Sequence, residues 1–65
     1  MRVLRLGDVI SLTGLARSTI YKSIGEGEFP RPINLIGRSV GWIEAEVHDW
    51  IRARVAERES PTVKS

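Results

Sequence analysis

The sequence predicts a small α+β domain in which two short helices meet at a tight corner and are followed by a β-hairpin and a longer helix. Three observations predict this order of elements. Gly14 separates two short segments whose apolar residues have helical spacing. Residues 37–39 contain a glycine and lie between two short apolar runs, which is typical of a β-hairpin. From Ile43 onward, apolar residues again recur with the period of a helix.

A chain of 65 residues is expected to form one domain whose core is too small for a sizeable substrate pocket. With no cysteine and one histidine, the chain predicts no disulfide, no metal centre and no cofactor. No nucleophile beside a base and no pair of carboxylates indicates catalysis, so we expect the protein not to be an enzyme. No apolar run is long enough for a signal peptide or a membrane span. We therefore expect a cytoplasmic protein that binds neither membranes nor small molecules.

A short strand and a helix are predicted to begin the chain. Residues 3–6 alternate in polarity, which predicts a strand with both leucines facing inward and a pairing partner later in the chain. The pattern then becomes helical, with Asp8 in the first turn, where a carboxylate complements the helix dipole. Val9 and Leu12 share one face of this helix. Gly14 is expected to end it, because glycine readily adopts a positive φ.

The second helix is predicted to begin near Ala16 or Arg17, with Ile20 and Ile24 one turn apart on its inward face. Ala16 is a poor N-cap, because alanine has no oxygen for the free N–H groups of the first turn. At about 100° per residue, the outward arc and its flanks carry hydroxyls and cations. These side chains belong to Arg17, Ser18, Thr19, Tyr21 and Lys22.

The segment after the second helix predicts a wing. Residues 25–27 are expected to end the helix, and two prolines then keep the chain extended around Phe29, which we expect in the core. The apolar runs 33–36 and 40–42 predict the two strands of a hairpin, with Arg38 projecting from its tip. A hairpin that follows a helix-turn-helix is a wing, so the predicted architecture is a small winged helix-turn-helix.

The last helix is predicted to close the core. Its inward stripe consists of Ile43, Val47, Trp50, Ile51 and Val55. Trp42 and Trp50 are expected to fill the core rather than to stack on a ligand, because aromatic side chains bury the most area per residue. The periodicity is lost after Ala56, which predicts a domain of residues 1–56 and a disordered tail of residues 57–65.

Charge is distributed unevenly along the chain. Residues 1–42 hold six cations and three anions, a net charge of +3, whereas residues 43–65 hold four cations and five anions, a net charge of −1. This asymmetry fits a basic face presented to phosphates, but an ordinary mixed surface is about as consistent with it. The basic outer face of the second helix is open to the same two interpretations.

Several motifs occur together in one order. They are Leu4-Arg5-Leu6, Thr13-Gly14-Leu15, Arg17-Ser18-Thr19-Ile20-Tyr21, Phe29-Pro30-Arg31-Pro32-Ile33, Gly37-Arg38, Val40-Gly41-Trp42, and Val47 with Trp50-Ile51. In this order, over residues 4–54, the chain resembles the AlpA-type prophage regulators, which are similar to phage excisionases and to the winged-helix domains of MerR-type regulators. The resemblance implies DNA binding near integrase genes, with control of integrase expression, of excision, or of both.

By position, the resemblance implies DNA contacts from the recognition helix and from the wing. The recognition-helix residues are Arg17, Ser18, Tyr21 and Lys22, and the wing residue is Arg38. Two positions depart from the family. Ala16 stands where the family usually has serine, and Asn34 stands where it often has a basic residue. Both departures weaken the expected hold on the DNA backbone.

We therefore expect a sequence-specific regulator of a prophage or genomic island, with double-stranded DNA as its partner. Arg17 is expected to read guanine in the major groove, and Arg38 to reach a flanking phosphate or the minor groove. Ser18, Thr19 and Lys22 are expected to contact mainly phosphates.

One small domain covers only a few base pairs, so specific binding is expected to need further contacts. Cooperative self-association on DNA and integrase as a further partner are both consistent with the sequence. Within the expected class, a role as an excisionase-like recombination directionality factor also stays open. The alternative function is a protein-interaction module that binds integrase or polymerase with little DNA contact of its own.

Overall fold

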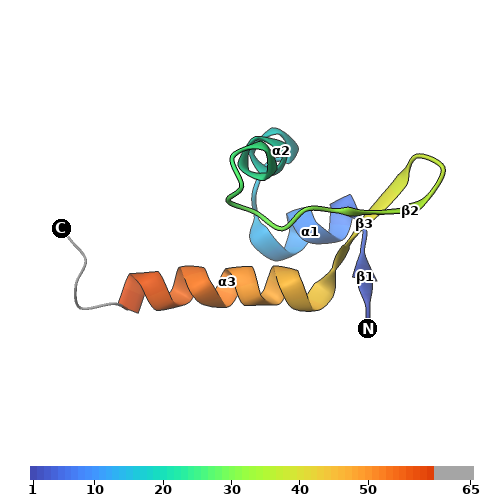
Figure 1. Cartoon of the computed structure of the whole chain (residues 1–65). Coiled ribbons are helices and arrows are strands. Elements are labelled where there is room, and N and C mark those ends of the chain that lie inside the picture. The colour runs from blue at the N-terminus through green and yellow to red at the C-terminus, as the bar shows by residue number, and fades with distance from the viewer. Residues whose placement is uncertain (60–65) are drawn as a thin grey trace.

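A strand, two short helices, a hairpin and a long helix follow one another in a computed structural model that describes residues 1–59 (Figure 1). The elements are β1 (Val3–Leu4), α1 (Leu6–Thr13), α2 (Arg17–Gly25), β2 (Ile33–Ile36), β3 (Ser39–Ile43) and α3 (Glu44–Glu59). This arrangement confirms the predicted α+β winged helix-turn-helix. Helices α1 and α2 form the helix-turn-helix, and β2 and β3 form the wing.

Strand β1 pairs antiparallel with β3, so the predicted partner of the first strand is the second strand of the wing. Leu4 lies opposite Trp42 in this pairing. The strand is shorter than predicted, because the backbone N–H of Arg5 donates to Asp8 Oδ2 at 3.1 Å and the helix begins at once. Leu6 is therefore the first residue of α1 and not a strand residue, although its side chain still packs against the core.

The corner between α1 and α2 is held by hydrogen bonds. Gly14 has a φ of 72°, as predicted for the end of α1, and its N–H donates to the carbonyl of Ile10 at 2.8 Å. The hydroxyl of Thr13 donates to the carbonyl of Val9 at 2.8 Å and accepts the N–H of Leu15 at 3.2 Å. These bonds give backbone N–H and C=O groups of the turn hydrogen-bond partners. They therefore help to fix the orientation of α2 relative to α1.

The core takes one buried side chain from the connector before β2 and one from each element except β2. These residues are Leu4, Val9, Ile20, Phe29, Trp42 and Val47, and none is more than 4% exposed. Leu12 and Val55, both predicted to face inward, are 45% and 40% exposed. Leu12 lies about 60° around α1 from Val9, at the edge of the buried stripe. Val55 lies in the half of α3 that projects beyond the other elements (Figure 1).

Both tryptophans hold the connector between α2 and β2. The indole N–H of Trp42 donates to the carbonyl of Pro30 at 3.0 Å, and that of Trp50 donates to the carbonyl of Glu28 at 2.6 Å. Between these two bonds Phe29 is buried, with its ring edge-on to Trp50 and the ring centroids 4.8 Å apart. The predicted core role is confirmed for the fully buried Trp42. Trp50 is only half-buried, so it packs beside the core and positions the connector.

Helix α3 begins at Glu44, because Ile43 is the last residue of β3 and not the first of the helix. It continues past Ala56 to Glu59, and an ion pair between Arg54 and Glu57 joins its last turns. The predicted tail lies mostly outside the described residues, so the domain boundary at residue 56 stays a prediction. Among residues 1–59, no helix is long and apolar enough to cross a membrane.

Candidate nucleic-acid interface

Helix α2 is anchored by its inner face and exposes the outer face that the sequence predicted. Ile20 is fully buried and Ile24 packs against the core, so the helix cannot rotate without losing both contacts. The predicted contact residues are all exposed, and they are Arg17, Ser18, Thr19, Tyr21 and Lys22. The structure therefore presents these five side chains together on one short helix.

The first turn of α2 has no side-chain cap. Ala16 occupies the N-cap with extended backbone (φ −72°, ψ 155°), which confirms the predicted helix start, and its methyl group accepts no hydrogen bond. The first N–H groups of a helix carry partial positive charge and need an acceptor from water, a side chain or a bound anion. The N-terminal end of α2 thus adds to the positive charge of Arg17.

Tyr21 connects the exposed face of α2 to the core. Its ring lies edge-on to that of Trp42, with the centroids 6.4 Å apart, and yet the side chain is 42% exposed. One part of the ring is therefore packed on the sheet while the rest reaches solvent. This arrangement suits a residue that both holds α2 in place and contacts a partner.

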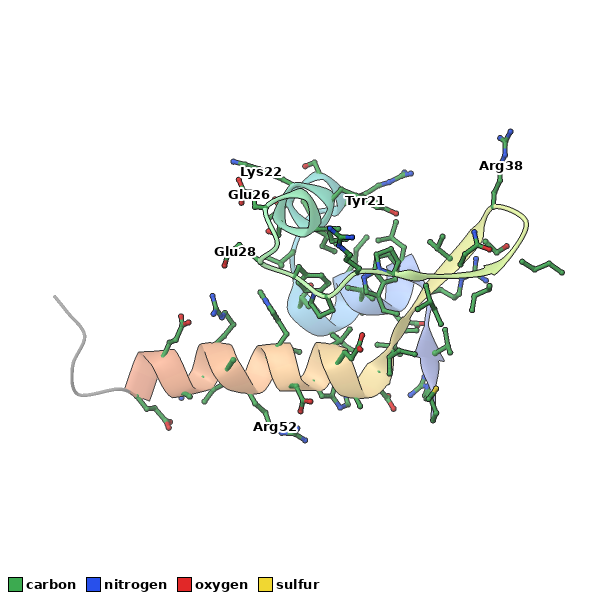
Figure 2. All side chains as sticks on the ribbon, in the orientation of Figure 1. Tyr21, Lys22, Glu26, Glu28, Arg38 and Arg52 are labelled. Atoms are coloured by element: carbon green, nitrogen blue, oxygen red, sulfur yellow. The ribbon has the colours of Figure 1, made fainter. Side chains whose placement is uncertain are left out.

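Arg38 lies at the tip of the wing, as predicted. The turn before it uses Gly37 at a φ of 55°, and Asn34 Nδ2 donates to the carbonyl of Gly37 at 3.1 Å. Figure 2 shows Arg38 and Lys22 extending from the side of the molecule opposite α3, whose Arg52 points the other way. The wing tip and α2 therefore present cations on the same side.

The cations within residues 1–59 fall into two groups. Four are engaged in ion pairs: Arg2 with Glu44 at 3.1 Å, Arg52 with Asp49 at 2.7 Å, Arg58 with Glu59 at 3.0 Å, and Arg54 with Glu57. The other five have no ion-pair partner among the described residues, and they are Arg5, Arg17, Lys22, Arg31 and Arg38. All five lie in or beside the helix-turn-helix, in the connector or in the wing, and none lies on α3. Three of these five, Arg17, Lys22 and Arg38, are the cations that the sequence predicted at the interface.

No contact was predicted for Arg31, which is exposed in the connector between α2 and the wing. A signal in the sequence could have found it. Pro30 and Pro32 flank Arg31, so the backbone there is extended and hydrogen-bonding to a neighbouring helix or strand is limited. An arginine on such a segment has few intramolecular partners, and Arg31 lies between Lys22 and Arg38 in the sequence and is exposed as they are.

Two carboxylates mark the opposite end of α2. Glu26 is the C-cap residue and Glu28 begins the connector, and neither is in an ion pair with a described residue. Figure 2 shows both on the side of α2 away from the wing, where Lys22 also lies. Arg17 lies in the first turn of α2 and Lys22 in its last turn, and the two carboxylates follow beyond the C-terminal end. A polyanion is therefore attracted to the N-terminal end, where no carboxylate of α2 opposes Arg17, and is repelled by Glu26 and Glu28.

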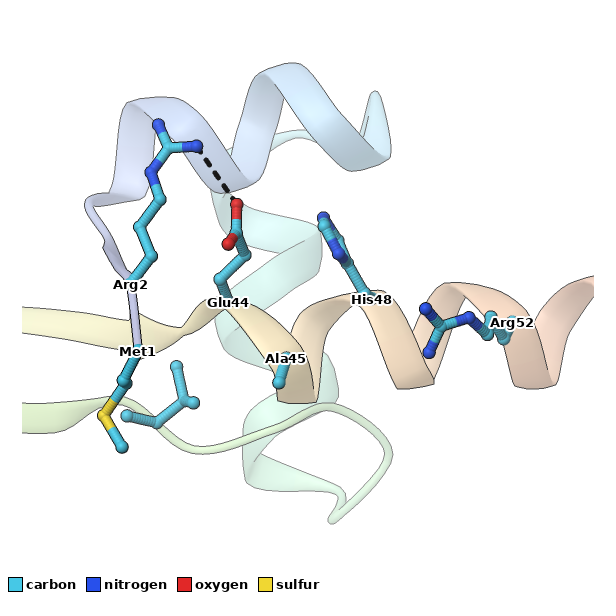
Figure 3. Close-up of a pocket in the computed structure, with 7 residues that line it drawn as sticks. Met1, Arg2, Glu44, Ala45, His48 and Arg52 are labelled. Atoms are coloured by element: carbon cyan, nitrogen blue, oxygen red, sulfur yellow. Dashed lines mark hydrogen bonds and ion pairs between the residues drawn. The ribbon is translucent and has the colours of Figure 1, made fainter.

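An open pocket of about 500 Å³ lies elsewhere, between the first residues of the chain and the start of α3 (Figure 3). It is lined by Met1, Arg2, Ile43, Glu44, Ala45, His48 and Arg52. No lining residue belongs to α2 or to the wing tip, and the arginines are already paired with carboxylates. The pocket therefore takes no part in the cationic surface.

Comparison with known proteins identifies the family to which the chain is similar. Residues 2–55 match the family described as "Prophage CP4-57 regulatory protein (AlpA)". Over 57 residues the chain is 47% identical to "Uncharacterized protein ORF88" of Enterobacteria phage P4, an alignment that covers 88% of this chain and 65% of that protein. Over 60 residues it is 43% identical to "DNA-binding transcriptional activator AlpA" of Escherichia coli (strain K12), covering 83% of this chain and 86% of that protein. The match to the family spans every helix and strand of the described fold except the last residues of α3.

Proposed function

The chain belongs to the AlpA family of prophage regulatory proteins, and from this premise we propose that it is a sequence-specific DNA-binding regulator of a prophage or genomic island. One observation carries the proposal. Of the five cations that have no ion-pair partner among residues 1–59, four lie on α2, in the connector or in the wing, whereas every cation of α3 within those residues is paired. A surface that keeps its cations available on one side is suited to the phosphates of DNA.

In the proposed complex the N-terminal half of α2 enters the major groove. Arg17 is in the first turn of α2, where the side chains of a recognition helix reach base edges, and its guanidinium matches the O6 and N7 atoms of guanine. Glu26 and Glu28 favour this orientation, because they would be repelled by phosphates if the other end of the helix were inserted. Arg17 is therefore the proposed base-reading residue.

The remaining contacts position the protein on the duplex. Ser18, Thr19 and Lys22 are exposed on α2 and are proposed to bind phosphates, as is the hydroxyl of Tyr21. Arg38 at the wing tip is proposed to reach a flanking phosphate or the minor groove. Such contacts raise affinity for any DNA sequence and carry little sequence information.

The regulated step is proposed from the family. The relative from Escherichia coli is named a transcriptional activator, and the family is described as prophage regulatory. Control of integrase expression fits both descriptions, and a direct excisionase-like role in recombination fits the second. We propose the former as the first activity to test, with integrase as a direct partner only in the latter.

The proposed function is tested by footprinting on the DNA that flanks the protein's own gene, followed by affinity measurements on the protected site at several salt concentrations. If about four phosphates are contacted, log affinity falls against log salt with a slope of about −3 to −4. Arg52→Ala is the matched control, because Arg52 is exposed but lies on α3 and is paired with Asp49. An affinity that is flat with salt, or that Arg52→Ala lowers as much as Arg17→Ala, contradicts the proposal and favours a protein-interaction module.

A further inference from the structure

Arg31 is the one cation in the sequence of the connector between α2 and β2, and the DNA contacts proposed above do not include it. Its side chain is exposed and is in no ion pair with residues 1–59. Glu28 lies three residues earlier, and yet the two side chains form no ion pair. By contrast, each arginine of α3 within the same residues is paired with a carboxylate of its own helix. Arg31 therefore keeps its charge available to a partner.

The backbone on both sides of Arg31 is restrained. The carbonyl of Pro30 belongs to the peptide group that precedes Arg31, and it accepts the indole N–H of Trp42 at 3.0 Å. Pro32 follows Arg31 and disfavours helical backbone at this position. Phe29, two residues before Arg31, is buried and only 4% exposed. A side chain on a restrained backbone loses less conformational entropy when it binds, so Arg31 is suited to a contact of fixed geometry.

The connector links the recognition helix to the wing (Figure 1). Trp42, which binds the carbonyl of Pro30, also contacts the ring of Tyr21, so the segment that carries Arg31 lies close to α2. Figure 2 shows Tyr21 on the side of α2 that faces the wing. At its other end the connector continues directly into β2, the first strand of the hairpin that carries Arg38. The backbone of Arg31 thus lies between the two parts of the molecule that are proposed to contact DNA.

The proposed contacts of α2 and of the wing lie on either side of one phosphate strand of the duplex. Such a strand separates each major groove from the minor groove beside it. A protein that places a helix in one groove and a wing beyond it must cross this strand, and the part of this chain between α2 and the wing is the connector. Positive charge is favoured at the crossing, because each strand carries one negative charge per about 3.4 Å of helix axis.

We propose that Arg31 binds a phosphate of the strand that separates the groove entered by α2 from the site reached by Arg38. This inference rests on the proposed DNA binding and adds a positioning contact to it. The contact reads no base, so it raises affinity for specific and non-specific DNA alike. Together with α2 and the wing tip, it fixes the register of the domain on the duplex.

The first measurement is the DNA affinity of Arg31→Gln at several salt concentrations. Loss of one phosphate contact should lower the affinity about five- to tenfold at about 0.1 M salt and make the slope of log affinity against log salt shallower by about 0.9. Specific and non-specific DNA should be affected equally. Arg31→Lys keeps the positive charge and should restore the slope. Because Arg31 is exposed, both variants should melt at the temperature of the wild type.

Arg52→Gln is the matched control for the loss of one positive charge. Arg52 lies on the opposite side of the molecule (Figure 2) and is paired with Asp49. Its loss should leave both the affinity and the salt slope close to those of the wild type. If Arg52→Gln lowers both as much as Arg31→Gln does, net charge alone explains the effect and the proposed contact is overturned.

Neutral phosphate analogues locate the contact. Each phosphate of the footprinted site is replaced in turn by a methylphosphonate, which carries no charge. One replacement that weakens the wild type should have no effect on Arg31→Gln, because that variant has already lost the contact. This phosphate should lie between the base pair whose preference is lost in Arg17→Ala and the end of the footprint that changes in Arg38→Ala. A phosphate on the far side of that base pair overturns the proposed placement.

The outcomes separate the inference from the proposed function. Wild-type protein that binds no DNA overturns the proposed function, and the Arg31 contact is overturned with it. If the wild type binds DNA and Arg31→Gln binds it with the same affinity and salt slope, the Arg31 contact alone is overturned. A loss confined to the specific site makes Arg31 a base-reading residue and contradicts the phosphate contact. A slope that Arg31→Lys does not restore contradicts a contact based on charge.

Discussion

The ring of Tyr21 on α2 lies edge-on to the ring of Trp42 on β3, with the centroids 6.4 Å apart and the ring planes at 61°. Trp42 in turn donates its indole N–H to the carbonyl of Pro30. Trp42, a residue of the sheet, therefore contacts both α2 and the connector that leads to the wing. This contact is one of those that fix α2 relative to the wing, together with the packing of Ile20 and Ile24 on the core.

The two parts of the Tyr21 side chain can be tested separately. Tyr21→Phe keeps the ring contact with Trp42, so the melting temperature should stay close to that of the wild type. If the hydroxyl binds a phosphate, DNA affinity should fall by about 1–2 kcal/mol. Tyr21→Ala should in addition lose about 0.5–1.5 kcal/mol of stability from the aromatic pair. Thermal melts and DNA titrations of both variants provide the measurements, and an unchanged affinity for Tyr21→Phe removes the hydroxyl from the interface.

Arg17 and Arg38 should differ in what their loss does to specificity. Arg17→Ala should weaken binding to the specific site by about 1–3 kcal/mol and leave non-specific DNA nearly as well bound, because it removes a base contact. Arg38→Ala should weaken both DNAs similarly and lower the salt slope by about one, because it removes a phosphate contact. Titrations on both DNAs decide between these effects. Equal losses for Arg17→Ala would place base reading elsewhere, and a loss confined to the specific site for Arg38→Ala would assign it to the wing.

The two tryptophans should differ in their effect on stability. Trp42 is fully buried, so Trp42→Ala should cost about 3–5 kcal/mol, which is comparable with the whole stability of a domain this small, and the variant should be unfolded. Trp50 is half-buried, so Trp50→Ala should cost less and leave a cooperative, lowered melt with a loosened connector. Circular dichroism melts of both variants make the comparison. A larger loss for Trp50 than for Trp42 would contradict the assignment of the core.

The N-cap of α2 offers a stabilising change. Ala16 makes no side-chain hydrogen bond, and Ala16→Ser supplies an oxygen to the first-turn N–H groups. The free energy of unfolding should rise by about 1 kcal/mol. Chemical denaturation measures this rise, and Ala16→Val, which provides no side-chain acceptor and is as poor an N-cap as alanine, is the comparison. No gain for serine would mean that the N–H groups of this turn are already satisfied in the folded protein.

The sequence determined which segments form helices and strands, because those signals are local. Gly14 ends α1 since it adopts a positive φ, and the glycine between the two apolar runs sets the hairpin that carries Arg38. The outward face of α2 follows from helical period alone once Ile20 and Ile24 are assigned inward. The side chains proposed to contact DNA could therefore be named without coordinates.

Only the tertiary structure decided which outward side chains are available and which apolar ones are covered. Val55 continues the stripe of Val47 and Ile51, yet it is exposed because no other element extends beneath that half of α3. The arginines of α3 and those of the interface look alike in the sequence. They differ because each arginine of α3 within residues 1–59 has a carboxylate of the same helix within 4 Å, whereas Arg17 and Arg38 are in no ion pair with those residues. The helical or strand period of a sequence predicts which way a side chain points. Whether that side chain is buried or forms an ion pair depends on the residues that the tertiary structure places next to it.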